Sequence, residues 1–209
     1  MKRKISAILF DLGGVLTRPQ DPECVRELMD WLGLDGEVER FKAAYFAHRD
    51  EYDRGTLGVE EYWRAVAADI GAAPAAAGLP RAIERDLDAW MQYRPGMLEV
   101  LTALRPRIRR LGLLSNINFE GARRLRSSFP RLELFDQLTL SCELGLMKPE
   151  PGIFASCLRS LGAEPSESLF VDDSVANVEG ARAAGLYSFR FIDEEQFTAE
   201  LATFYELLA

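Results

Sequence analysis

The chain has 209 residues, a length that suits one α/β domain or one such domain with a modest insertion. With 48% hydrophobic and 28% charged residues, it has the composition of a folded globular protein and not of a disordered chain. The formal net charge of −8 argues against a general nucleic-acid or membrane-surface binder, because both surfaces are anionic and would repel the chain.

The N-terminus begins with the basic residues of a signal peptide, but its apolar run, residues 7–10, is cut short by Asp11 and two glycines. No stretch approaches the roughly 20 apolar residues that would span a bilayer. Three cysteines, Cys24, Cys142 and Cys157, are scattered and odd in number. These features predict a protein of the reduced cytoplasm that has no membrane segment.

Short apolar runs recur along the chain and are typical of buried strands. The first, residues 8–10, runs into the glycine-rich loop that contains Asp11, and four others cover residues 111–114, 137–140, 168–171 and 188–192. Helical patterns separate most of these runs. Strands that alternate with helices imply right-handed crossovers and a parallel sheet, so we predict a Rossmann-like α/β core.

The stretch from about Asp21 to Tyr93 lacks convincing strands and shows helical spacing of apolar residues, as in Val25, Leu28 and Leu32. We therefore expect two units. An α/β core comprises residues 1–18 and 94–209, and a small helical insertion after the first strand comprises residues 19–93.

Polar residues follow three of the predicted strands, as Asp11, Ser115-Asn116 and Asp172-Asp173. In a parallel sheet the ligand site lies beyond the carboxyl ends of the strands, so we expect these side chains to converge there. Lys148 lies in segment 145–151, where two prolines hold the backbone extended just before a predicted helix over 152–161, and it can neutralise a bound phosphate.

The nucleophile follows by exclusion. The chain has one histidine, His48, which gives little support to phosphohistidine catalysis or a histidine-rich metal site. No cysteine is followed six residues later by the arginine of a cysteine-based phosphatase loop. The carboxylate of Asp11 remains, beside a loop in which the backbone N–H groups near Gly13 and Gly14 can approach a phosphoryl oxygen.

The same residues suggest a metal. Asp172 and Asp173 beside Asp11 would repel one another without a cation, and Mg²⁺ prefers oxygen ligands. Asp11, the Gly13 carbonyl, Asp173 and the neighbouring Asp172 are the expected ligands. Ser115, Asn116 and Lys148, together with Gly13 and Gly14, are expected to hold the phosphate.

This constellation resembles the haloacid dehalogenase superfamily, whose pattern is a nucleophilic Asp, then Ser/Thr, Lys and an acidic pair, here Asp11, Ser115, Lys148 and Asp172-Asp173. The match spans essentially the whole chain. The segments 10–13, 114–116, 144–150 and 172–177 are most similar to the branch of bacterial α-D-glucose-1-phosphate phosphatases. The resemblance implies a helical cap over the site and magnesium-dependent hydrolysis of a small metabolite, such as a sugar phosphate, through an aspartyl-phosphate. In such a cap His48, Tyr52 and Arg54 would face the substrate.

The chain departs from this pattern at one position. Most phosphatases of the superfamily have a second Asp two residues after the nucleophile, as general acid and base, where this chain has Gly13. General acid–base help is worth about 10² to 10⁴ in rate, so its loss predicts a slower enzyme or another proton source. The glucose-1-phosphatase-like branch shares this glycine.

Three other interpretations remain at this stage. A HAD-like protein that binds or regulates without turnover would explain Gly13. A 2-haloacid dehalogenase uses a homologous Asp without a metal, but such a site has little reason to gather Asp172 and Asp173. A phosphorylated receiver domain also combines these residue types, but its acidic pair precedes the phosphorylated Asp.

Overall fold

A five-stranded parallel sheet forms the centre of the protein in a computed structural model that describes residues 2–207. The strand order is β4-β3-β2-β5-β6, so the first of these strands lies in the middle. The strands are β2 (Ala7–Phe10), β3 (Arg110–Ser115), β4 (Gln137–Leu140), β5 (Ser168–Asp172) and β6 (Tyr187–Arg190). The predicted α/β fold with a parallel sheet is confirmed.

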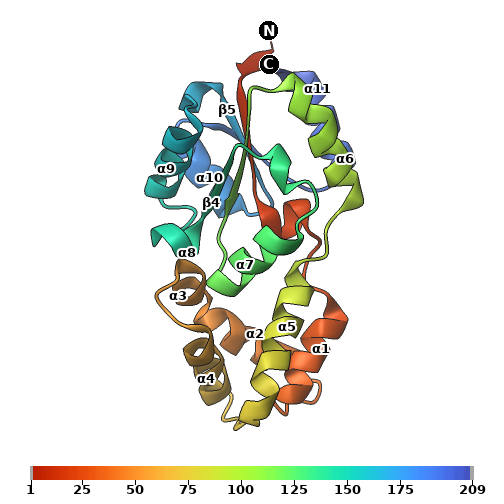
Figure 1. The fold of residues 1–209 in the computed structure, drawn as a ribbon, viewed down its shortest axis with the longest axis vertical. Coiled ribbons are helices and arrows are strands. Elements are labelled where there is room, and N and C mark those ends of the chain that lie inside the picture. The colour runs from red at the N-terminus through yellow and green to blue at the C-terminus, as the bar shows by residue number, and fades with distance from the viewer. Residues whose placement is uncertain (1, 208–209) are drawn as a thin grey trace.

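Helices cover both faces of this sheet because alternate side chains of each strand point to opposite faces. Ile8 and Phe10 of β2 pack with α6 (Pro95–Leu104), α7 (Phe119–Ser128) and α11 (Glu194–Phe204). Leu9 packs on the other face with α9 (Pro151–Leu161) and α10 (Val175–Ala183). Figure 1 shows α9 and α10 on one side of the sheet and α6 and α11 on the other. All of β2 is buried, which places its carboxyl end inside the molecule.

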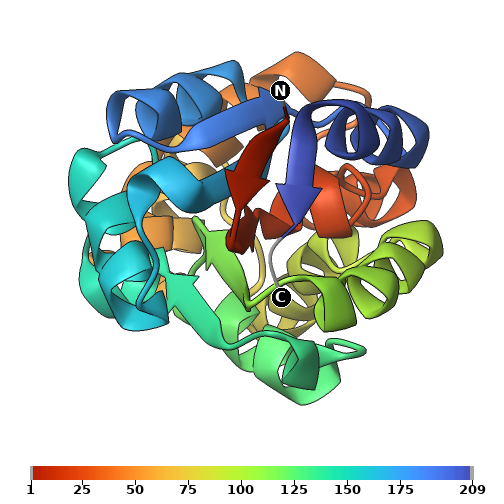
Figure 2. The same cartoon turned by 90° about the horizontal axis from the view of Figure 1, so that it is seen from above.

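A second, two-stranded parallel sheet pairs β1 (Arg3–Ile5) with β7 (Tyr205–Leu207). In Figure 2 this pair lies toward the viewer, at the end of the molecule that is opposite the helical insertion. Neither strand was predicted, because three residues are too few to show a period. The predicted strand over 188–192 extends too far, since β6 ends at Arg190 and the Ile192 N–H donates to the Gln196 side chain.

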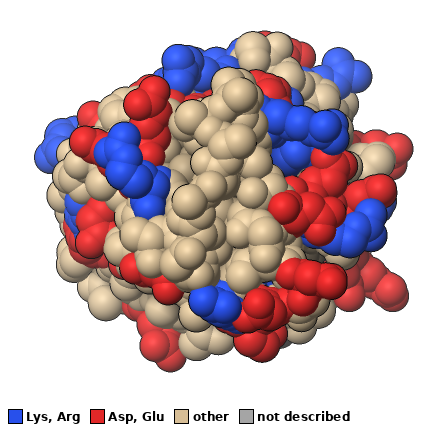
Figure 3. Space-filling view, turned by 90° about the horizontal axis from the view of Figure 1, so that it is seen from below, with Lys and Arg blue, Asp and Glu red and all other residues tan. Residues whose placement is uncertain are grey.

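Helices α1 to α5 form one unit below the sheet in Figure 1, with a hydrophobic cluster of their own. They are α1 (Pro22–Trp31), α2 (Val38–Ala47), α3 (Arg49–Arg54), α4 (Val59–Asp69) and α5 (Leu79–Trp90). Aromatic side chains dominate this cluster, among them Phe41, Tyr45, Tyr62 and Trp63. Figure 3 views this end from below and shows side chains of both charges around a band of uncharged residues.

The chain crosses between core and insertion at two adjacent segments. Thr17 and Tyr93 form an isolated antiparallel bridge, and the Arg94 N–H donates to the Leu16 carbonyl at 2.9 Å. The division into residues 1–18 with 94–209 and residues 19–93 stays a prediction. We find no helix in residues 2–207 with both the length and the apolar character needed to cross a membrane.

The remaining regular segments are short. A tight turn covers Leu12–Leu16 directly after β2, and α8 (Ser141–Leu144) follows β4. Turns of 3-10 helix lie at Ala76–Gly78, Arg105–Arg107, Leu132–Leu134 and Pro165–Glu167.

Candidate active site

Asp11 follows the central strand directly and begins the turn at Leu12–Leu16. Its side-chain Oδ1 accepts the Leu12 N–H at 2.7 Å, which orients the carboxylate at the strand end. Gly14 has a φ of +73°, and a Cβ at this position would lie 2.2 Å from Oδ2 of Asp173. Only glycine therefore lets the loop after β2 and the carboxylate after β5 come this close.

Lys148 is buried between two carboxylates. Its Nζ lies 2.6 Å from Oδ1 of Asp11 and 2.7 Å from Oδ2 of Asp172, and 1% of its side chain is exposed. The Asn116 side chain holds the Lys148 backbone on both sides, accepting its N–H at 2.9 Å and donating to its carbonyl at 3.0 Å. Asn116 thus positions Lys148, and a direct contact between Asn116 and a substrate stays a prediction.

The two members of the acidic pair have different surroundings. Asp172 is fully buried and accepts from the Ser174 N–H at 2.8 Å, from the Asn177 amide at 3.1 Å and from Lys148. Asp173 is exposed, and its carboxylate accepts no hydrogen bond from another residue in the described part of the chain. Asp173 is therefore the freer ligand, and Asp172 mainly holds Lys148 and the start of α10.

The three carboxylates form a site that suits a hard cation. One oxygen each of Asp11, Asp172 and Asp173 lie within 4.8 Å of one another. Three carboxylates and Lys148 leave a formal charge of −2, which one divalent cation would balance. The donors are all oxygen atoms, the type that Mg²⁺ prefers, so these residues fit a magnesium site.

The titration of the cluster reflects its burial. Burial raises the pKa of Asp11 to about 8; Lys148 opposes this, and Asp172 and Asp173 add to it. Asp173 is exposed as a residue, but the protein around its carboxyl removes part of the water there, and this desolvation and then Asp172 raise its pKa. For Lys148, Asp11 and Asp172 together outweigh burial and raise its pKa, so the lysine stays cationic.

A cavity of about 550 Å³ lies next to this cluster, between the core and the helical insertion. The core contributes the predicted residues Asp11, Gly13, Gly14, Ser115, Asn116, Lys148 and Asp173 to its lining. Asp172 lies behind Lys148 and does not line it. The structure therefore brings the predicted residues together at one edge of the sheet, while their chemical roles stay predictions.

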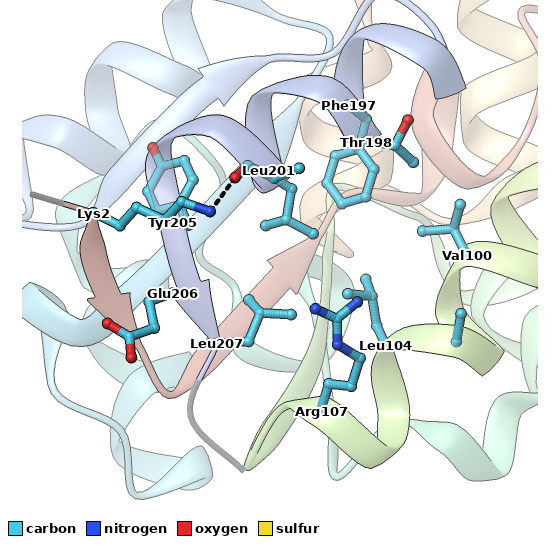
Figure 4. Close-up of a pocket in the computed structure, with 12 residues that line it drawn as sticks. Lys2, Val100, Leu104, Arg107, Phe197, Thr198, Leu201, Tyr205, Glu206 and Leu207 are labelled. Atoms are coloured by element: carbon cyan, nitrogen blue, oxygen red, sulfur yellow. Dashed lines mark hydrogen bonds between the residues drawn. The ribbon is translucent and has the colours of Figure 1, made fainter.

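A second cavity of about 600 Å³ contains none of the predicted residues. It lies between α6 and α11, with apolar walls that include Val100, Phe197 and Leu201 and with Lys2 and Arg107 at its margin (Figure 4). Lys2 donates to a backbone carbonyl at 2.5 Å there. This cavity has no cluster of catalytic groups comparable to that around Asp11.

The expectation that His48, Tyr52 and Arg54 face the substrate is wrong, since none of them lines the cavity above Asp11. His48 points to Asp69 at 2.8 Å, and Tyr52 is buried, with its hydroxyl donating to Glu120. Arg54 pairs with Glu150, in the segment that carries Lys148. These side chains instead pack the insertion and hold it on the core.

Residues of the insertion that were not predicted from the sequence also line the cavity, among them Arg49, Asp53, Asp86 and Trp90. Arg49 and Asp53 are spaced i and i+4 on a helix, a signal of neighbouring charges that was available in the sequence. Asp86 and Trp90 share this spacing on α5. Nothing in one sequence shows that these two faces turn toward Asp11.

Gly13 adopts an ordinary backbone conformation, with φ −65° and ψ 131°. A Cβ at this position would lie 3.8 Å from the Trp90 ring, a normal van der Waals contact. Neither the backbone nor the space at this position requires a glycine. The missing carboxylate is therefore a chemical difference that the fold does not impose.

Comparisons with known proteins agree on one family. The haloacid dehalogenase-like hydrolases match residues 5–185. D-ribitol-5-phosphate phosphatase of Bacteroides thetaiotaomicron is 28% identical, over 89% of this chain and 91% of its own. A phosphatase of Mycobacterium tuberculosis is also 28% identical, over 88% and 86%. Two further curated relatives are much longer proteins, of which this chain spans 17% and 6%.

Solved structures show the same fold. A HAD family enzyme of Bacteroides thetaiotaomicron, in complex with magnesium and inorganic phosphate, superposes with a TM-score of 0.72 at 26% identity. The similarity covers 89% of this chain and 93% of that one.

Proposed function

Because this chain belongs to the haloacid dehalogenase-like hydrolase family, we propose that it is a magnesium-dependent phosphatase of a small phosphorylated metabolite, such as a sugar phosphate. One observation carries the proposal. The Asp11 carboxylate lies at the floor of a cavity, with Lys148 at 2.6 Å and the unpaired carboxylate of Asp173 beside it. Two findings support this proposal: the related enzyme forms a complex with magnesium and phosphate, and the chain is similar to two phosphatases.

The proposed reaction has two steps. A carboxylate oxygen of Asp11 bonds to phosphorus as the bond to the leaving oxygen breaks, and that oxygen takes a proton from water and leaves as an alcohol, which gives an aspartyl-phosphate. Water then bonds to phosphorus, the bond to Asp11 breaks, and inorganic phosphate leaves. Lys148 and the N–H groups of the loop around Gly14 would hold the phosphoryl charge. Ser115, buried at the end of β3, is a further contact for a phosphoryl oxygen.

Magnesium would be held by Asp11, Asp173 and the Gly13 carbonyl, with Asp172 behind them. When bound, it supplies positive charge that stabilises the ionised carboxylates and the phosphoryl oxygens. The chain itself keeps Lys148 in place through Asn116 and Asp172, so a cationic donor faces the position of the phosphate.

The test compares wild type with Asp11→Asn in a screen of sugar, nucleotide and short organic phosphates. We expect magnesium-dependent phosphate release from wild type and its loss in the variant. Asp30→Asn, on the exposed surface of α1, is the matched control and should keep full turnover. Wild-type turnover by Asp11→Asn would refute the proposal.

A second candidate is a binding or regulatory protein without turnover, and Gly13 is the observation that favours it. Magnesium-dependent phosphate release that is lost in Asp11→Asn would exclude this candidate. The alternative of metal-free 2-haloacid dehalogenation would be supported by halide release that survives chelation. The unpaired carboxylate of Asp173 argues against it, because it would repel an anionic substrate.

We further propose the cytoplasm as the site of action. Cys24, Cys142 and Cys157 are all free and buried, as expected of a chain in a reducing compartment.

A further inference from the structure

The wall of the cavity opposite Asp11 contains a second buried cluster of charges, which we call the roof cluster: Arg49, Asp53, Asp86 and Tyr45. Arg49 is 13% exposed, and its Nε donates to Asp53 at 3.0 Å. Its Nη1 donates to the Tyr45 hydroxyl at 2.6 Å and lies 3.4 Å from Asp86. A phosphate held at Asp11 would place its leaving group under this cluster.

The protonation of the roof cluster follows from its hydrogen bonds. The Tyr45 hydroxyl oxygen accepts from Arg49, from the Trp90 indole at 2.8 Å and from the Gln20 amide at 3.2 Å. Arg49 and Trp90, the two nearer donors, are enough to fill its two lone pairs, so its own proton points to Asp86 in a short hydrogen bond. Burial raises the pKa of Tyr45 well above its usual value, which keeps this proton on the phenol. Asp86 is thus an acceptor on both oxygens, the arrangement of a carboxylate.

The roof cluster therefore carries one positive and two negative groups, a formal charge of −1. Asp53 is fixed from the core as well, because the Asn118 amide donates to its second oxygen at 3.2 Å. Burial raises the pKa of Asp86, while Arg49 opposes this. The remaining cation of the roof, Lys42, is solvent-exposed and pairs with Glu39. Lys42 lines the cavity too, but water screens its exposed charge, so the buried groups on the leaving-group side stay net negative.

A neutral part of a ligand would meet hydrogen-bonding groups on this side of the cavity. Arg49 lines the cavity with 13% of its side chain exposed, so part of its guanidinium is open to a ligand there. The oxygens of Asp53 and Asp86 are acceptors beside it. The Trp90 ring, held by its bond to Tyr45, forms a flat apolar wall between Gly13 and this cluster.

We propose that Arg49, Asp53 and Asp86 form a leaving-group subsite that binds a neutral, hydroxyl-bearing group and excludes a second anionic group. The inference rests on the proposed phosphatase function. Hydroxyl groups can both donate to the carboxylates and accept from the exposed part of the Arg49 guanidinium, whereas a carboxylate or second phosphate would meet the net negative charge.

The test uses two open-chain probes that differ at one carbon: D-glucitol 6-phosphate ends in a hydroxymethyl group, and 6-phospho-D-gluconate ends in a carboxylate. Binding is measured by calorimetry with magnesium in Asp11→Asn protein, which cannot form the aspartyl-phosphate. We expect the neutral probe to bind about tenfold to a hundredfold more tightly, the size of one like-charge contact at partial burial. Equal or tighter binding of the carboxylate probe, or no binding of the neutral one, overturns the proposal.

Neutralising the roof cluster should relax this preference. Asp86→Asn keeps the side-chain shape and removes one charge, so we expect the ratio of the two affinities to fall at least about fivefold. Asp53→Asn is a second variant with the same expectation. The matched control is Asp88→Asn, on the same helix but outside the cavity, where Asp88 pairs with Arg85 and Arg124. An unchanged ratio in both roof variants would contradict the proposal.

Failure of this proposal is distinguishable from failure of the proposed function. Wild-type turnover of the two probes without a preference would remove the subsite and leave the phosphatase. A clear binding preference without magnesium-dependent turnover of any phosphoester would leave the subsite and count against the phosphatase.

Discussion

The floor and the roof of the cavity each bury one cation between two carboxylates, yet they suit different chemistry. On the floor, Lys148 lies between Asp11 and Asp172, and on the roof, Arg49 lies between Asp53 and Asp86. The floor adds a third carboxylate and a loop of glycines, which leave space and charge for a metal. The roof adds aromatic rings.

The rings explain the difference. The Arg49 guanidinium lies between 5.2 and 5.8 Å from the ring centroids of Tyr45, Tyr52, Tyr62 and Trp90. These rings stabilise the cation and fill the space that a hydrated metal would need. The same pattern of charges thus becomes a metal site when small residues surround it and a fixed donor site when aromatic residues do.

The largest expected effect comes from removing each cation. Lys148→Met and Arg49→Met each remove the cation between two buried carboxylates, so each should lower the free energy of unfolding by about 3–5 kcal/mol. Lys148→Met should also reduce turnover by about 10²–10³, the cost of one charge-stabilising donor. Urea unfolding and phosphate release measure the two effects.

Magnesium should affect the stability of Lys148→Met and Arg49→Met differently. Added magnesium should recover part of the stability of Lys148→Met, because a cation can bind among the three carboxylates. It should recover none for Arg49→Met. Equal recovery in both would break the contrast between floor and roof.

The second prediction concerns Gly13, where the floor meets the Trp90 ring of the roof. Gly13→Asp suits the local backbone and places a carboxyl group beside the reacting atoms, so turnover should rise about tenfold to a hundredfold. Steady-state kinetics of the substrate found in the screen provide the measurement. Gly13→Asn is the control, since it adds the same volume without a proton to transfer, and an equal gain in both variants would refute the acid–base explanation.

The third prediction distinguishes the two members of the acidic pair. Asp173→Asn should weaken magnesium binding about 10- to 100-fold, because the Asp173 carboxylate accepts no hydrogen bond from another described residue. Asp172→Asn should instead lower stability by disrupting its bonds to Lys148, Ser174 and Asn177. Calorimetric titration with magnesium checks both variants. A larger loss of magnesium affinity in Asp172→Asn than in Asp173→Asn would exchange the roles of the two residues.

The fourth prediction is a pH dependence. Asp11 titrates near pH 8 in the folded chain without metal and near 3.8 when unfolded, so the folded state binds the extra proton between these values. The contribution of Asp11 to the stability of the metal-free protein should therefore be full below about pH 4 and decrease as pH rises toward 8. Saturating magnesium should flatten the part of this pH dependence that is due to Asp11. Burial also raises the pKa of Asp86, and its contribution to the pH dependence should persist. Unfolding midpoints in EDTA and in magnesium test this, and a metal-free stability that increases over the window would contradict it.

Much of the floor was predictable from the sequence, and the reason is geometric. Asp11, Ser115 and Asp172 each follow an apolar run, and parallel strands bring their carboxyl ends to one edge. Lys148 was identified through its place in the motif order. The support given to it by Asn116 was not, because an amide at a strand end does not reveal which backbone it will bind.

The roof was not predictable in the same way. Arg49, Asp86 and Trp90 lie on helices, where one sequence shows the period but not which partner a polar face meets. His48 and Arg54 are as polar as Arg49 and lie within six residues of it, yet they point to Asp69 and Glu150. Only the docking of α3 on the core, through Asp53 to Asn118, decides which of these side chains faces Asp11.

The smallest expected effect tests whether that docking depends on the exposed contact beside it. Arg54 pairs with Glu150 across the junction, and the two side chains are 31% and 40% exposed. Because water screens such a pair, a double-mutant cycle of Arg54→Gln and Glu150→Gln should give a coupling of about 0.2–1 kcal/mol in unfolding free energy. Turnover should change less than twofold. A coupling of several kcal/mol would mean that this exposed pair, and not the buried bond between Asp53 and Asn118, holds the roof over the floor.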